Sequence, residues 1–181
     1  MRTVGKVLLV LVLLAVAWTV LLRFFLLPHE VRNPKKYSSL LTEWRSRGLV
    51  KHFPDPLPSS ATNIKLSSFP GVMQAGAWLQ VRFNLPPDEV GRIFDEASRV
   101  AKDYYDGGDI YESVNSEKHG LAGTSFHTYD PDDGKSSIFP EDYRVFVFAA
   151  SDDGGSWNHG QSSGVVVSKQ RNEVIYFAED W

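Results

Sequence analysis

The chain contains no cysteine. This absence excludes disulfide bonds, thiolate nucleophiles and metal sites built from thiolates. Asn-x-Ser/Thr sequons, internal repeats and low-complexity tracts are absent as well. The five histidines never stand two or four residues apart, so no two can share one face of a predicted element: His29, His52, His119, His127 and His159. The sequence therefore predicts no metal and no other cofactor.

Positive charge is scarce after the first 36 residues. Six of the 19 Lys and Arg residues stand in that N-terminal part, but only one of the 22 Asp and Glu residues does, namely Glu30. Residues 37–181 therefore hold 13 basic and 21 acidic residues and have a formal charge of −8. Because contacts with phosphates supply most of the affinity for nucleic acid, this surface disfavours nucleic acid and anionic headgroups. We expect no nucleic-acid partner.

The most informative feature that is present is an apolar run over residues 7–27, interrupted only by Thr19 and Arg23. As a helix it would be about 31 Å long, and the apolar core of a bilayer is about 30 Å thick. Arg23 lies four residues from the end of the run, where its long side chain can carry the guanidinium to the interface. We predict a six-residue N-terminal tail followed by an uncleaved transmembrane signal anchor that binds the lipid bilayer.

Two other interpretations of the run are open. Arg2 and Lys6, the apolar residues after them and Ala15-Val16-Ala17 resemble the three parts of a cleavable signal peptide, but the chain stays apolar beyond that point. A buried helix of a globular core fits less well, because apolar residues fill every face of the helix.

The orientation in the membrane follows from the flanking charges. Two basic residues precede the run and three follow it within the polar tether over residues 28–36, so the positive-inside bias is almost balanced. The short N-terminal tail favours a cytoplasmic N-terminus. We expect the domain over residues 37–181 to lie outside the cytoplasmic membrane, and a cytoplasmic domain is the alternative.

The domain shows alternating patterns of helix and strand. A helix is expected over residues 37–47, ended by Gly48, and a second one from Pro86 along an apolar stripe that reaches Tyr104. Strands are expected over residues 64–69, 77–85, 143–150, 164–168 and 174–178, with loops over 110–140 that hold at most one short strand around 124–129. This order predicts an α+β domain in which a mostly antiparallel sheet packs against a long amphipathic helix.

The strand over residues 77–85 has the clearest alternation. Its apolar side chains are expected to face a core, while Trp78, Gln80, Arg82 and Asn84 are expected to face water. The strand over residues 143–150 is apolar on both faces, which predicts a central position in the sheet.

Two short motifs suggest a catalytic site or a metal site, but their flanking residues or their spacing do not fit such a site. Gly160-Gln161-Ser162-Ser163-Gly164 matches the nucleophile elbow, but that motif requires a helix after the serine and three valines follow here. We expect a Gly/Ser loop at that place. Residues 130–134 are acidic, but their spacing does not fit an EF-hand and predicts a solvated turn.

The candidate contact residues are Trp157, Asn158 and His159 in a glycine-flanked loop. A large aromatic ring, an amide and an imidazole together suit the recognition of a sugar or a peptide edge. The structural alternative is that Trp157 covers a sheet edge while the other two hold the loop backbone.

Two stretches of the chain carry a resemblance. The first contains His52-Phe53-Pro54, Leu57-Pro58, Ala61, Pro70-Gly71 and Gln74; the second contains residues 156–160, 164–168 and 172–181. Together they resemble a family of small, N-terminally membrane-anchored, mostly bacterial proteins of no assigned function. The resemblance covers residues 50–181, implies a setting in the bacterial envelope and brings no active site with it.

The sequence thus predicts a single-pass, membrane-anchored protein that serves as a binding or structural module of the cell envelope, with an envelope protein or glycan as partner. The alternative function is a membrane-anchored hydrolase whose site is assembled from the loops over residues 106–140 and 151–164. Whether the chain is an enzyme is left open, and we favour a module without catalytic residues.

Overall fold

The computed structural model of the chain describes residues 12–14, 16, 18, 29–72, 76–108, 124–129, 138–152 and 160–180. Within this described part, no helix combines the length and the apolar character needed to cross a bilayer. Only five residues of the predicted transmembrane run belong to it.

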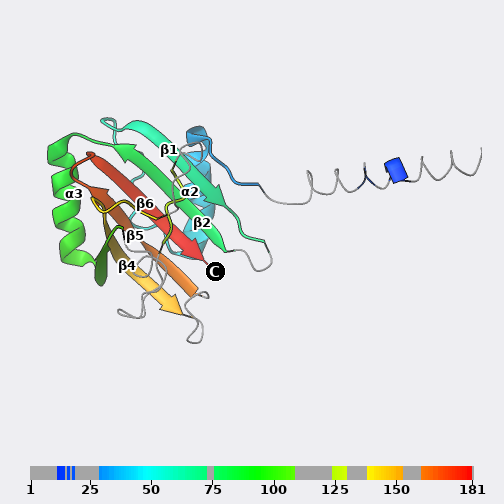
Figure 1. The fold of residues 1–181 in the computed structure, drawn as a ribbon. Coiled ribbons are helices and arrows are strands. Elements are labelled where there is room, and N and C mark those ends of the chain that lie inside the picture. Colours follow the sequence, from blue (N-terminus) through cyan, green and yellow to red (C-terminus); the bar gives the residue numbers. More distant parts are fainter. Residues whose placement is uncertain are drawn as a thin grey trace, which may run out of the picture.

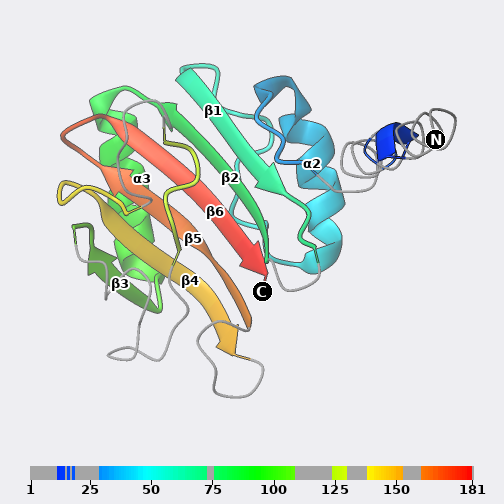
Figure 2. The same ribbon diagram turned by 45° about the vertical axis from the view of Figure 1, so that its right-hand side comes forward.

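The domain is built on a six-stranded antiparallel sheet with the strand order β1-β2-β6-β5-β4-β3. The strands are β1 (Thr62–Phe69), β2 (Ala77–Asn84), β3 (Asp103–Asp106), β4 (Arg144–Asp152), β5 (Gly160–Ser168) and β6 (Glu173–Asp180). The helices are η1 (Pro34–Lys36), α2 (Tyr37–Trp44), η2 (Arg45–Arg47) and α3 (Pro87–Val100). The sheet twists, and α2 and α3 lie on the same side of it near its two ends (Figures 1 and 2). The predicted α+β class and the antiparallel sheet are confirmed.

The first predicted helix is confirmed as α2 together with η2. It ends where expected, because Gly48 adopts a left-handed conformation with φ of 76° that a residue with a side chain rarely adopts. The hydroxyl of the buried Tyr37 donates a hydrogen bond to the Pro54 carbonyl over 2.6 Å, which fixes the helix to the loop that follows it.

The second predicted helix starts as expected but ends earlier. Pro87 occupies its first turn together with Asp88 and Glu89, which interact favourably with the helix dipole. The helix stops at Val100 because residues 103–106 pair with β4 as an edge strand, and the expected continuation to Tyr104 is therefore wrong. Val100 and Tyr104 are 59 % and 54 % exposed.

The helix-covered face of the sheet holds the larger core. Leu79, Val81 and Phe83 of β2 point into it and are fully buried, which confirms the alternation predicted for this strand. Each such side chain contributes about 1.5–3 kcal/mol of transfer free energy to folding.

The opposite face of the sheet is partly open to water, because Trp78, Arg82 and Asn84 of β2 are half-buried, and the prediction is wrong for Gln80. Gln80 is fully buried there, because residues 124–129 cross this face and hydrogen-bond to it. Those residues contain no strand. A second core lies beneath this segment: Tyr105, Phe126, Phe139, Tyr143, Val145, Val147, Val166, Ile175 and Phe177. Strand β4 supplies both cores, as its two apolar faces predicted.

The predicted polar tether is attached to the domain within its described part. The Val31 amide donates to the Ser68 carbonyl over 2.7 Å, and the Ser68 amide donates back over 3.0 Å. The Glu30 carboxylate also accepts a hydrogen bond from Ser67 of β1. The chain is thus fixed to the edge strand of the sheet at residue 30, close to the end of the apolar run.

Candidate functional site

The residues singled out in the sequence fall into two groups. Trp157, Asn158 and His159 lie outside the described residues, and so do the acidic residues 130–134. The Gly160–Gly164 motif lies in β5, so the expected loop is wrong while the rejection of a nucleophile elbow stands. Ser162 is fully buried and its hydroxyl has no hydrogen-bond partner among the described residues, so it is not presented to a substrate.

Gly164 shows what this motif does in the fold. A Cβ atom at this position would lie 1.9 Å from the Phe146 carbonyl oxygen and 2.8 Å from the ring of Phe177. The glycine therefore allows two neighbouring strands and an aromatic side chain to approach closely. Its role is packing.

One histidine does meet a buried carboxylate. His127 Nε2 lies 3.5 Å from Glu179 Oε1, and the Glu179 side chain is only 3 % exposed. The Thr124 hydroxyl donates a hydrogen bond to the same oxygen, and the ring of Trp78 stacks on His127 with the centroids 4.3 Å apart. The Glu179 carboxylate thus contacts Thr124 and His127 of the segment that crosses the sheet. The adjoining cavity has a volume of only about 230 Å³.

A second buried carboxylate is also satisfied within the fold. Arg82 Nε lies 2.7 Å from Glu173 Oε2, and Glu173 also accepts a hydrogen bond from the Tyr143 hydroxyl. Burial and the nearby Glu173 raise the pKa of Tyr143 well above its ordinary value, so the phenol stays protonated and keeps donating. This cluster holds the strands together.

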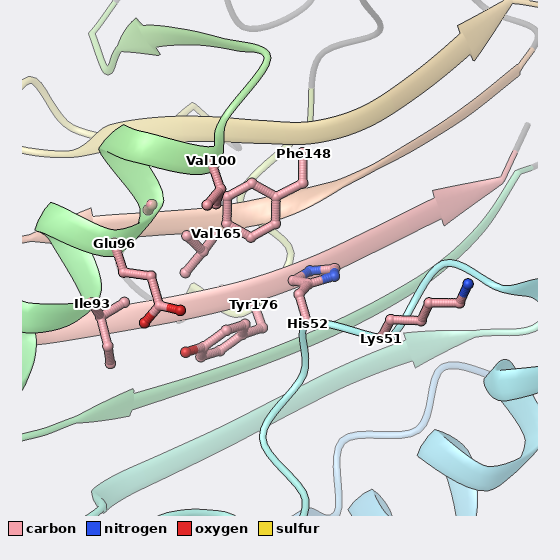
Figure 3. Close-up of a pocket in the computed structure, with 9 residues that line it drawn as sticks. Lys51, His52, Ile93, Glu96, Val100, Phe148, Val165 and Tyr176 are labelled. Carbon is pink, nitrogen blue, oxygen red and sulfur yellow. The ribbon is translucent and has the colours of Figure 1, made fainter.

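A larger cavity lies on the helix-covered face, and we call it the α3 pocket. Its volume is about 500 Å³. It lies between α3 and the loop that contains His52, above strands β4, β5 and β6 (Figure 3). Nine residues line it: Lys51, His52, Ile93, Glu96, Ala97, Val100, Phe148, Val165 and Tyr176. Six of these have apolar or aromatic side chains, and the partly exposed Val100 is among them.

His52 closes the side of the pocket away from α3. Its Nε2 donates a hydrogen bond to the Gly164 carbonyl over 2.8 Å, and its ring makes edge contacts with Phe53 and Phe148. Burial lowers the pKa of His52 to about 4, although the Gly164 carbonyl opposes this shift. The ring is therefore neutral at pH 7 and acts as a wall of the pocket.

Tyr176 and Glu96 supply the polar groups of the pocket. Burial and the charge of Glu96 raise the pKa of Tyr176 to about 12, so its hydroxyl remains protonated. Figure 3 shows the Glu96 carboxylate and the Tyr176 hydroxyl on the same side of the pocket. Among the described residues, no hydrogen-bond partner of this hydroxyl and no ion-pair partner of Glu96 is found.

The described side chains hold no metal centre. No group of three or more His, Asp or Glu residues comes together within the described ranges in a way that could bind an ion. The two buried carboxylates, Glu173 and Glu179, are thus satisfied within the described part of the fold, whereas Tyr176 and Glu96 leave unsatisfied polar groups at the α3 pocket.

Sequence reasoning missed the α3 pocket. Its residues come from the loop after η2, from α3 and from three different strands, and no local pattern connects them. The one available signal was Val100, an apolar residue at the end of α3 that the helix does not bury.

Comparison of the chain with protein-family models, with curated proteins and with solved structures yields no match. The resemblance to the anchored bacterial family therefore gains no support. A proposal for the function has to rest on the geometry of the site.

Proposed function

We propose that the chain is a membrane-anchored binding module that takes up a small, largely apolar ligand in the α3 pocket. The observation that carries this proposal is the pocket itself. Cavities that bind small molecules typically have volumes of about 300–1,000 Å³, mostly apolar walls and a few converging polar groups. The α3 pocket, at about 500 Å³ with Tyr176 and Glu96 on one side, fits this description.

Exposure of the N-terminal apolar residues supports the anchor. Each of the five described residues in this run is more than half exposed, although all are apolar: Val12, Leu13, Leu14, Val16 and Trp18. The described part of the domain leaves these side chains exposed to water, whereas a bilayer would bury them. We keep the transmembrane span at residues 7–27 and the domain outside the cytoplasmic membrane as parts of this proposal.

A reporter fusion tests the anchor. Phosphatase or a fluorescent protein would be joined after Trp181, and the product would be sized in the membrane fraction. Phosphatase activity on a full-length, membrane-bound product is expected. Fluorescence in the cytoplasm would reverse the orientation, and a product shortened by roughly the first seventeen residues would replace the anchor with a cleaved signal peptide.

A substitution at the rim tests the pocket. Val100→Trp places a large ring at the mouth of the pocket, and Arg99→Trp adds the same ring at the neighbouring position, which does not line it. Calorimetric titration of the full chain in nanodiscs with 2-phenylethanol should show binding that Val100→Trp weakens at least about tenfold, or about 1.4 kcal/mol. Equal binding by both variants would place the ligand elsewhere.

The hydrolase remains the second candidate function, and the contact between His127 and Glu179 is the observation in its favour. A general base needs a nucleophile or a water within reach. Within the described residues, the nearest hydroxyl of this cluster belongs to Thr124, which is 2 % exposed and already donates to Glu179. The cluster therefore fits a structural role better. The envelope protein or glycan expected at residues 157–159 stays a prediction.

A further inference from the structure

The charges around the α3 pocket bear on the kind of ligand that it takes. Three lining residues could carry charge, namely Lys51, His52 and Glu96. His52 is neutral at pH 7, because burial lowers its pKa to about 4 and its Nε2 hydrogen is donated to the Gly164 carbonyl. It adds no positive charge to the pocket.

Lys51 and Glu96 differ in where their charged groups lie. The Lys51 ammonium points away from the other lining side chains, whereas the Glu96 carboxylate is directed toward the Tyr176 hydroxyl (Figure 3). Lys51 belongs to the exposed surface of the loop, so water screens its charge. Glu96 is exposed as well, but it lies over an apolar floor where a ligand would displace that water. The formal charge directed to the pocket by the described residues is negative.

The aromatic floor of the pocket also favours a positively charged ligand. The rings of Phe148 and Tyr176 line it together with Val165. The face of an aromatic ring attracts cations, and such contacts contribute about 0.5–2 kcal/mol depending on their exposure. An ammonium group could also donate to the Tyr176 hydroxyl oxygen, for which no partner is found among the described residues.

We propose that the α3 pocket binds an organic ammonium ion with an apolar body, the ammonium lying between the Glu96 carboxylate and the Tyr176 hydroxyl and the body on Phe148, Val165 and α3. This inference rests on the proposed function of the pocket and names its ligand class. A ligand of the same size with a carboxylate would be repelled by the Glu96 carboxylate, because no cation among the described residues of the pocket faces it. An alcohol of the same size would form no ion pair with Glu96.

Three probes of matched shape test the ligand class: 2-phenylethylammonium, 2-phenylethanol and phenylacetate. Their affinities would be measured on the full chain in nanodiscs from the methyl resonances of Ile93 and Val165, which line the pocket. We expect the ammonium to bind about tenfold more tightly than the alcohol, as one charged hydrogen bond at a partly exposed site allows. Phenylacetate should bind most weakly.

Two variants that each remove one negative charge from α3 separate the role of Glu96 from a general effect of charge. Glu96→Gln should abolish the preference for the ammonium, whereas Asp95→Asn should keep it, because Asp95 lies on the same helix 3.6 Å from Lys169 and does not line the pocket. Equal affinity for all three probes, tighter binding of phenylacetate, or a preference that survives Glu96→Gln would overturn the inference and leave the pocket as a binding site. Failure of every probe to bind would overturn the proposed function along with it.

Discussion

His52 and Gly164 lie 112 residues apart in the chain and are joined by a hydrogen bond of 2.8 Å from the imidazole Nε2 to the carbonyl oxygen. The bond fixes the loop after η2 to the centre of the sheet. It also holds His52 in the wall of the α3 pocket opposite α3, so this loop supplies that wall.

Burial of His52 makes stability depend on pH in a defined window, and the hydrogen bond to Gly164 offsets only part of this effect. The pKa of His52 is about 4 in the fold and near 6.5 in the unfolded chain, so the unfolded chain binds the proton more readily. The contribution is complete above about pH 6.5 and is lost as the pH falls toward 4, by at most about 3 kcal/mol. Urea denaturation at pH 7 and at pH 4.5 should show a smaller loss for His52→Gln than for the wild type. Titration of the carboxylates lowers the stability of both proteins equally, so only His52 can make the two losses differ. Equal losses of unfolding free energy in the wild type and in His52→Gln would therefore contradict this account.

Gly164 should tolerate no side chain. Gly164→Ala places a methyl group 1.9 Å from the Phe146 carbonyl oxygen and should lower the free energy of unfolding by about 3 kcal/mol or more. Gly91→Ala is the matched control, since a Cβ at this helical position meets nothing within 4 Å. It should raise stability by about 0.5–1 kcal/mol. Thermal unfolding of both variants measures the contrast, and similar melting temperatures would contradict it.

Much of this fold follows from local pattern. The alternation over residues 77–85 is strong, and the proline and acidic residues at the start of α3 define where that helix begins. Strand β3 could not be predicted, because four residues form an edge strand only where β4 offers unpaired backbone groups. The apolar spacing up to Tyr104 therefore indicated helix where pairing with a distant strand decides the structure.

The candidate site was less predictable than the fold. His52 was considered only among the five histidines and in the resemblance, and nothing local indicated its contact with Gly164. Gln80 was expected to face water because alternation shows which residues share a face but not what covers that face. The cover is the segment over residues 124–129, which has no periodic pattern of its own.

Arg82 should be essential for the buried Glu173. The Glu173 side chain is 6 % exposed, and Arg82→Met would remove the cation that lies 2.7 Å from its carboxylate. A loss of about 3–5 kcal/mol in the free energy of unfolding is expected. Arg92→Met removes an arginine whose side chain is 74 % exposed and should change stability by less than about 1 kcal/mol. Chemical denaturation measures both, and a small effect at Arg82 would mean that Glu173 is neutral in the fold.

Gln80 should hold the crossing segment on the sheet. Its amide nitrogen donates to the Ser125 carbonyl over 2.6 Å, and its oxygen accepts from the His127 amide over 3.0 Å. Gln80→Leu should therefore speed hydrogen exchange at the His127 amide by about tenfold, corresponding to the loss of one buried hydrogen bond. Gln161→Leu, which affects a bond to Asp180, should leave that amide unchanged. Equal exchange in the two variants would show that other contacts hold the segment.

The most direct test of the α3 pocket compares two adjacent valines on opposite faces of β5. Val165 lines the pocket, whereas Val166 belongs to the core beneath the crossing segment. Titration of the full chain in nanodiscs with 2-phenylethanol should shift the Val165 methyl resonances in a saturable manner and leave those of Val166 unchanged. Unchanged resonances at both residues, or equal shifts at both, would contradict the assignment of this pocket as a ligand site.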